Sequence, residues 1–438
     1  MAHSTEHKNV SPTVNELVGP QLTALASKAP IAIGIGGLLT LAGLVLSKET
    51  FFQSYLFAFM FWFGITLGST AWLMGHNVTG GGWGFLLRRQ LEAATRNWPI
   101  VLAMWFPLLV AVYFSSLNGH AGLYEWADQH VLHTDHVLNK KVGYLGMIPF
   151  LVRQVLYFAI WFGMAHLLNK WSKQEDQSDD PYIRHRSSMW SALGLLVYVL
   201  TLTFATIDWV MTIEPHWFSS LWGPIFLVGQ AQSTLCVMII LTRYVAGHTN
   251  IVKNVEGRYF RDVGNFMMAF TLLWAYTNYS QFMIQYSGNI AEEAEWFVHR
   301  TTYGWQYYGA VNIITHFVAP FLLLLMSMNK VNMNNLVKLA AFLIVARHID
   351  LFFYVVPTFR TTPVTGLPGG EFPFAFLADI GLPILLGGIW IFGWANQMKK
   401  ANAPIVPVYD TRLNPYWPLA DGTVGQSVEN TKGVTSHG

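Results

Sequence analysis

Long apolar segments alternate with short polar segments along almost the whole chain. A membrane-spanning helix needs about 20 predominantly apolar residues. The stretches that meet this requirement are 29–47, 51–75, 99–118, 142–168, 187–213, 218–247, 262–288, 304–329, 334–357 and 376–398. This pattern predicts an all-α integral membrane protein with about ten transmembrane helices. The ten-helix membrane domain is expected over 29–398, between an N-terminal tail, 1–28, and a C-terminal tail, 399–438.

The composition agrees with a membrane protein. Hydrophobic residues make up 53% of the 438 residues and charged residues only 11%, whereas a soluble domain carries about a quarter charged residues. The net charge of +2 gives no support for nucleic-acid binding.

The distribution of lysine and arginine predicts the orientation of the helices. Both tails and the loops after even-numbered helices hold 17 of the 26 basic residues, and the loops after odd-numbered helices hold 5. Because basic residues concentrate on the cytoplasmic side, both termini are expected in the cytoplasm. One basic segment, with Arg88, Arg89, Glu92 and Arg96, predicts an interfacial helix that meets lipid headgroups.

An Ile-Asp pair followed by proline occurs twice within apolar sequence. The first copy has Asp208 and Pro215, and the second has Asp350 and Pro357. A carboxylate inside a membrane helix is costly and usually serves protons, ions or substrate. The two copies lie four helices apart, which suggests duplicated four-helix bundles made of helices 2–5 and helices 6–9. A chance match between two apolar segments is the alternative.

The ninth predicted helix carries the densest group of ionisable residues. Arg347 and Asp350 are spaced i, i+3 and can pair on one face, while His348 points about 100° away. An unperturbed histidine titrates near neutral pH, so this residue type suits a proton relay. The alternative is a salt bridge that only neutralises itself, although buried ion pairs rarely repay their desolvation.

Other helices supply further proton-relay candidates. Arg153, on the fourth helix, is an intramembrane cation whose natural partner is one of the two aspartates. His316 follows Asn312 by four residues, and is either a relay member or a satisfied core histidine. Asp379 begins the last helix on the external side. The proposed relay set is therefore Asp208, Asp350, His348, Arg347, Arg153, His316 and Asp379.

Polar residues of the seventh helix and its surroundings are candidates for binding a quinone. These candidates are Gln281, Tyr279, Glu292 and Tyr354. Gln281 belongs to a polar stripe of the helix, and such side chains also join helices to one another without binding a ligand.

Redox centres are not expected on this chain. Cys236 is the single cysteine, which excludes an intrachain disulfide, a cysteine-ligated iron–sulfur cluster and a C-x-x-C-H haem attachment. The intramembrane histidines lack the paired arrangement for two b-type haems. Histidines of the loop 119–141 could bind a metal, but the segment is exposed, so no metal site is assigned.

Three segments resemble a known family of membrane subunits. They read FATIDWVMTIEPHWFSSLWG (204–223), FTLLWAYTNYSQFMIQYSGNIAEE (270–293) and RHIDLFFYVVP (347–357). The chain resembles the NrfD/polysulfide-reductase-type subunits, ten-helix proteins of quinone-linked respiratory complexes. Its closest likeness is to the F subunits of alternative complex III, the quinol:cytochrome c oxidoreductase of many bacteria.

The resemblance implies a subunit that contributes quinone binding, a proton pathway, or both, linked to menaquinol oxidation in a bacterial inner membrane. Menaquinone or menaquinol is the implied ligand. The implied partners are a sister NrfD-like subunit, an iron–sulfur subunit, multihaem cytochrome c subunits, a terminal oxidase and lipids, with haems and clusters held by those partners. Two alternatives stay open: an autonomous proton- or ion-coupled transporter, and a structural membrane anchor.

Overall fold

The computed structural model describes residues 13–118, 122–178, 180–247, 257–360 and 372–404. In these residues the chain is helical and contains no β-strand, only one isolated bridge between Thr13 and Pro404. Nine helical stretches of this part are long and apolar enough to cross a membrane. The predicted all-α membrane protein is therefore confirmed.

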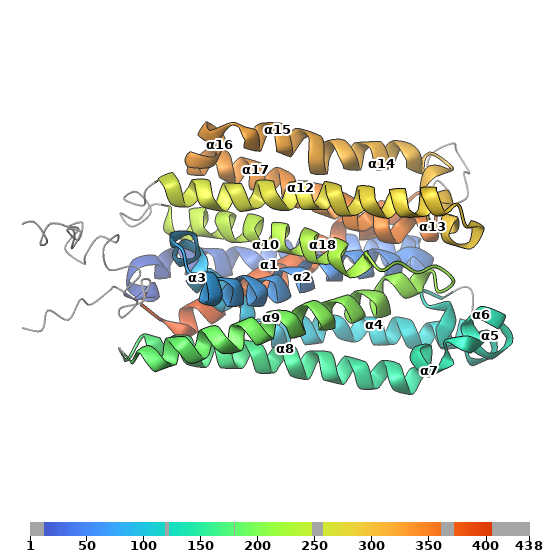
Figure 1. The fold of residues 1–438 in the computed structure, drawn as a ribbon, viewed down its shortest axis with the longest axis horizontal. Helices are drawn as coiled ribbons and strands as arrows, with labels where there is room; N and C mark the ends of the chain where they lie inside the picture. The colour runs from blue at the N-terminus through green and yellow to red at the C-terminus, as the bar shows by residue number, and fades with distance from the viewer. Residues whose placement is uncertain (1–12, 119–121, 179, 248–256, 361–371, 405–438) are drawn as a thin grey trace, which may run out of the picture.

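The long helices run roughly parallel to the long axis of the molecule (Figure 1). They are α1 (Val14–Leu46), α2 (Phe51–Thr79), α4 (Trp98–Asn118), α8 (Met147–Glu175), α9 (Pro181–Trp209), α10 (Trp222–Ala246), α12 (Gly257–Gly288), α17 (Met333–Val355) and α18 (Ala375–Ala401). The eighth predicted helix is interrupted and consists of α14 (Trp305–Ile313), a π-helical segment (Ile314–Val318) and α15 (Ala319–Leu325). α12 is more polar than the nine membrane-spanning candidates but lies among them.

Short helices cover the two ends of the bundle. They are α3 (Gly82–Thr95), α5 (Gln129–Thr134), α6 (His136–Lys140), α7 (Val142–Leu145), α13 (Ala291–Thr301) and α16 (Ser327–Val331). α3, α16, the start of α1 and the end of α18 lie at one end, which we call the terminal end (Figure 1). α5, α6, α7 and α13 lie at the opposite end, which we call the α13 end. The loops after even-numbered predicted helices thus lie at the end opposite to the loops after odd-numbered ones. A cytoplasmic location for the terminal end stays a prediction.

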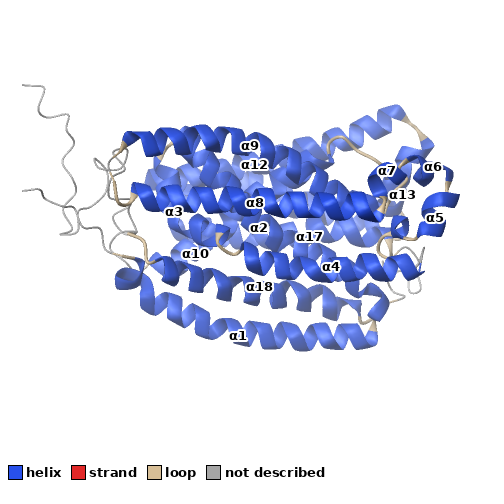
Figure 2. Ribbon diagram, turned by 90° about the horizontal axis from the view of Figure 1, so that it is seen from below, coloured by secondary structure: helices blue, strands red, loops and turns tan. Residues whose placement is uncertain are grey.

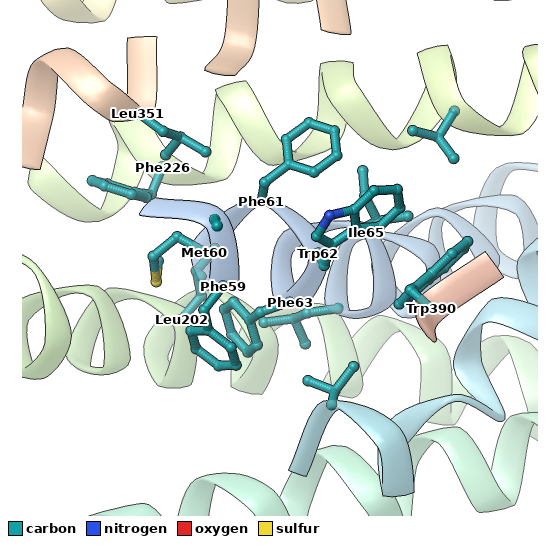
Figure 3. Packing of buried hydrophobic residues seen from close by; sticks show 14 of the residues in the cluster. Phe59, Met60, Phe61, Trp62, Phe63, Ile65, Leu202, Phe226, Leu351 and Trp390 are labelled. Atoms are coloured by element: carbon teal, nitrogen blue, oxygen red, sulfur yellow. The ribbon is translucent and has the colours of Figure 1, made fainter. Parts of the chain in front are cut away.

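α2 is the central helix of the bundle. Its aromatic side chains contact neighbours on several sides. The ring centroid of Phe61 lies 4.0 Å from that of His348, and the centroids of Trp62 and Trp390 lie 5.4 Å apart. Phe63 and Trp209 make an edge-to-face contact with centroids 4.9 Å apart. Figure 3 shows this ring of side chains around α2, reaching α9, α10, α17 and α18. A helix that is apolar all round belongs in the interior, and α2 is almost completely buried.

The first helix begins earlier than predicted. α1 starts at Val14, so about half of the expected tail 1–28 is helical. Glu16 accepts a hydrogen bond from the backbone of Thr13, and Asn15 bonds to the end of α18 through Asn402 and the carbonyl of Lys399. Polar residues therefore continue the helix because they pair with its neighbour, α18, which the apolar pattern could not indicate.

The helices fall into two packed groups that meet at α2, α9, α10 and α17. α2, α4, α8 and α9 form one group, and α10, α12, α14–α15 and α17 form the other. α1 and α18 pack against each other at the side of the bundle (Figure 2). α2 packs against α10 of the second group as extensively as against α9 of its own, so the contacts do not separate two bundles, and the duplicated bundles of helices 2–5 and 6–9 stay a prediction.

The charged residues of α3 are buried, which corrects the prediction that they meet lipid headgroups. Glu92 binds Arg88 at 3.1 Å and Arg89 at 2.9 Å, and the two arginines continue to Glu175 and Asp176 on α8 at 2.5 and 2.6 Å. Burial acts to raise the pKa of Glu92, but the arginines outweigh it and hold this pKa at about 2. α3 is therefore fastened to α8 by a continuous ion-pair network.

Candidate functional site

Asp208 lies near the end of α9 and is 0% exposed. Arg153 of α8 grips both oxygens of its carboxylate, with Nε donating to Oδ2 and Nη2 to Oδ1, each at 2.9 Å. The pairing of Arg153 with one of the aspartates is therefore confirmed. The guanidinium also donates to the carbonyl of Tyr144 at 2.7 Å and lies 3.8 Å from the centre of that residue's ring.

Two further donors complete the surroundings of Asp208. Gln154 donates to Oδ2 at 3.1 Å and Tyr157 at 3.0 Å. The amide oxygen of Gln154 in turn accepts a hydrogen bond from the indole of Trp209 at 2.8 Å. The three residues that donate to Asp208 all belong to α8. Both carboxylate oxygens therefore have hydrogen-bond donors, and the Asp208 cluster connects α8 to α9.

Asp350 lies on α17 and is also 0% exposed. Arg347 donates to its Oδ2 at 2.5 Å, as the i, i+3 spacing predicts. Trp274 of α12 donates to the same oxygen at 3.1 Å, and Asn312 of α14 donates to Oδ1 at 3.0 Å. The Asp350 cluster therefore joins three helices of the second group at one carboxylate.

A glycine of α10 makes room for Arg347. A β-carbon at Gly229 would lie 2.1 Å from Nη1 of Arg347 and 2.3 Å from its Cζ. The guanidinium therefore lies directly on the α10 backbone, with the ring of Phe226 5.6 Å away. Gly229 gave no signal in the sequence, since only the close approach of two helices makes it necessary.

His316 lies in the π-helical segment and is 0% exposed. Its ring stacks on Trp274, with centroids 4.3 Å apart, and within the described structure neither ring nitrogen has a hydrogen-bond partner. Proline clashes with the carbonyl four residues before it, and Pro320 stands four residues after His316. The widened π turn relieves that clash, and such turns occur frequently at functional sites.

His348 is separate from the Asp350 cluster. Its Nδ1 lies 2.9 Å from the carbonyl of Ile344, an arrangement in which the ring N–H donates to the backbone. The ring faces Phe61 and lines an apolar recess of 430 Å³ between α1, α2, α17 and α18. The structure thus places His348 and Asp350 on different sides of α17, as their spacing of two residues, about 200° around the helix, predicts.

Asp379 belongs to a third carboxylate cluster, at the α13 end. Arg360 donates to its two oxygens at 2.8 and 2.9 Å, and Ser54 of α2 donates to Oδ1 at 2.6 Å. Gln53 accepts a hydrogen bond from Nε of Arg360 at 3.2 Å. Arg360 was not among the sequence candidates. The arrangement fastens the start of α18 to the start of α2.

A fourth cluster joins the loop after α9 to α13. Arg300 donates to Glu214 at 2.9 Å and to the carbonyl of Tyr354 at 2.7 Å. Burial acts to raise the pKa of Glu214, but Arg300, His299 and Thr358 outweigh it and hold this pKa at about 2. Arg300 was also missed, because it lies in a segment that the sequence suggested was an external loop.

Two of the four quinone candidates, Gln281 and Tyr354, already have partners in the described structure, and quinone binding by the four stays a prediction. Gln281 accepts a hydrogen bond from Ser219, and Tyr354 is buried and donates to Asn278 at 2.7 Å. Tyr279 is 63% exposed on the outer face of α12. Helical spacing turns it away from the face that carries Gln281. Glu292 lies in α13, and its side chain is outside the described residues.

The loop between α4 and α8 uses its acidic residues to cap short helices. Asp128 accepts a hydrogen bond from the backbone of His130 at the start of α5, and Asp135 accepts bonds at the start of α6. Asp135 also lies 3.0 Å from the ring of His216. Within the described residues, no group of three or more His, Cys, Asp or Glu side chains is arranged to hold a metal ion.

No protein-family model matches this chain, and no curated protein matches it. The roles proposed below therefore depend on the geometry of the four clusters and on the sequence resemblance.

Proposed function

We propose that this chain is the proton-handling membrane subunit of a respiratory quinol:cytochrome c oxidoreductase of the alternative complex III type. The observation that carries the proposal is that Trp274 contacts two buried titratable groups, since it donates to Asp350 and stacks on His316. Asp350 is fully buried, and His316 is a fully buried imidazole with two unpartnered nitrogens among the described residues. Asn312 donates to Asp350 and precedes His316 by one helical turn. Asn312 and His316 therefore lie on the side of the α14–α15 helix that faces Asp350.

The chemistry of these groups fits proton transfer. A buried polar nitrogen without a partner costs free energy, and such groups in native proteins call for an explanation such as an ordered water or a role in chemistry. An imidazole can accept a proton on one nitrogen and release it from the other. Arg347 donates to Asp350, and a movement of its guanidinium away from Gly229 would break this contact and open that side of the carboxylate.

Asp208 has a different proposed role. It receives two bonds from Arg153 and one each from Gln154 and Tyr157. Both carboxylates thus have occupied oxygens, but only Asp350 shares a partner, Trp274, with an imidazole that lacks hydrogen bonds in the described structure. This observation favours the structural-anchor alternative for this cluster, and likewise for Asp379 with Arg360. Within the proposal, the second helix group handles protons and the first maintains the bundle.

The resemblance supplies the rest of the proposal. The quinol would be menaquinol, and redox centres would be held by an iron–sulfur subunit and multihaem cytochrome c subunits in a bacterial inner membrane, with both termini of this chain in the cytoplasm. Exposed apolar residues on α8, α9 and α12 offer surfaces for lipids or for a sister membrane subunit. Gln281 and Tyr354 approach the same face of α12, because Tyr354 bonds to Asn278, which precedes Gln281 by three residues; a quinone site on this chain is not part of the proposal.

The test compares single variants in the assembled complex. Asp350→Asn and His316→Asn are expected to lower quinol:cytochrome c turnover, and the proton release coupled to it, about a hundredfold. Asp262→Asn removes a half-buried carboxylate of α12 outside the cluster and serves as the matched control. Full turnover and full proton release in both test variants would contradict the proposal. Proton or ion uptake by the chain alone in vesicles would favour the transporter alternative.

A further inference from the structure

A polar recess of 860 Å³ opens at the terminal end, between α3, α8 and the end of α18. Two acidic residues line it, and both are already paired. Glu92 binds Arg89 at 2.9 Å, and Asp176 binds the same arginine at 2.6 Å. The negative charge of the recess is therefore already neutralised by groups that belong to the bundle.

The remaining charges of the recess are positive. Lys170, Lys173 and Lys400 line it and make no hydrogen bond or ion pair within the described structure. Arg96 approaches Glu92 only at 3.7 Å. Burial lowers the pKa of Arg96 below its ordinary value and Arg89 lowers it further, against the opposing effect of Glu92. These four cations surround a volume large enough for an anionic group, and no described residue supplies one.

An exposed apolar surface begins at the edge of the recess. α4 starts two residues after Arg96, and one of its faces carries Leu102, 39% exposed, and Phe106, 62% exposed. α4 runs toward the α13 end and lies between α8 and α18 in the view of Figure 2. Arg96 of the recess therefore stands just before the start of a membrane-spanning helix that carries exposed apolar side chains.

We propose that this recess binds the phosphate headgroup of an anionic phospholipid, with the acyl chains along the exposed face of α4. Basic pockets between membrane helices on the cytoplasmic side suit lipids with phosphate groups. A free phosphate would use the same cations but would leave the apolar face of α4 without a role. The proposal does not depend on the function proposed for Asp350.

The test uses the full-length chain in detergent after removal of bound lipid, with tetraoleoyl cardiolipin as the probe and native mass spectrometry to count bound lipids. Lys170→Gln combined with Lys173→Gln is expected to weaken cardiolipin binding about 30-fold, since each basic residue near the surface contributes roughly a factor of five. Both lysines are exposed, so their replacement leaves the bundle intact. Lys170→Arg with Lys173→Arg is expected to retain binding.

The matched control is Lys28→Gln with Lys338→Gln, which removes the same charge from exposed positions on α1 and α17. Equal loss of cardiolipin in the control and test variants would overturn the proposal. Dioleoyl phosphatidylcholine is expected to bind much more weakly than cardiolipin, and equal binding of the two would also overturn it. Displacement of cardiolipin by an equimolar amount of sodium phosphate would assign the recess to free phosphate instead.

Discussion

The hydroxyl of Thr358 donates a hydrogen bond to Glu214 at 2.5 Å, so the segments that follow the two Ile-Asp helices contact each other. Arg300 completes the contact, because it binds Glu214 and also the carbonyl of Tyr354. The two helix groups are thus joined at the α13 end by residues that directly precede Pro215 and follow Pro357. The repeated sequence marks a junction between the groups as well as a pair of buried carboxylates.

Replacing Glu214 with Gln is expected to destabilise the protein by about 3 kcal/mol, because the buried Arg300 loses its counter-charge. Thermal unfolding of the detergent-solubilised chain measures this effect. Glu295→Gln, at an exposed position of α13, is the control and is expected to leave the unfolding temperature unchanged. Equal stability of both variants and the unmodified chain would show that the cluster does not fasten α13.

Stability is expected to fall in acid because of Glu92 and Glu214. Both carboxyl groups have a folded-state pKa of about 2, below their ordinary 4.5. Their contribution is therefore complete above pH 4.5 and is lost as the pH falls toward 2. Each contributes on the order of 3 kcal/mol. Unfolding experiments at decreasing pH should show this decline, with a shallower pH dependence in Glu92→Gln. A flat profile down to pH 3 would contradict it.

The pair Arg153 and Asp208 is expected to be strongly coupled. Asp208→Asn leaves a partly buried guanidinium without its charge partner, and Arg153→Gln leaves a buried carboxylate with only two donors. Each single variant should lose about 3 kcal/mol, and the double variant should lose clearly less than the sum. Additive losses in this double-mutant cycle would show that the pair contributes no interaction of its own.

Gly229→Ala is expected to impair proton handling without changing any charge. The new methyl group would occupy the position of the Arg347 guanidinium and force it away from Asp350. Turnover of the assembled complex should fall, with a changed dependence on pH. Gly34→Ala on α1 is the control, since its methyl group would meet nothing within 4 Å. Equal turnover in the two variants would argue against a role for the position of Arg347.

Pairs within a helix, or between helices adjacent in the chain, could be predicted from the sequence. The spacing of Arg347 and Asp350 fixes their contact through helix geometry alone. A buried arginine in apolar surroundings needs a carboxylate partner, and Asp208 on the next helix is close to Arg153 along the chain. Membrane helices themselves follow from uninterrupted apolar length. The spans of α2, α4 and α18 were accordingly predicted to within a few residues at most ends.

Contacts between distant segments could not be predicted in this way. Arg300 lies 86 residues from Glu214, and its helix is too short and polar to be recognised as part of the bundle. The burial of α3 depends on acidic partners at the end of α8. The sequence does carry one signal at His316, since Pro320, four residues later, indicates a disturbed helix at that histidine. The stacking of His316 on Trp274 required the packed structure.

The central position of α2 has a consequence for biogenesis. Ser54 and Trp62 of α2 donate hydrogen bonds to Asp379 and Pro383 of α18, and Thr66 accepts one from Trp390. These partners are synthesised more than 320 residues later. A newly made chain must therefore insert nearly all its helices before the innermost one gains its final neighbours. A chain truncated before Ala375 should insert into the membrane, remain unassembled and be degraded.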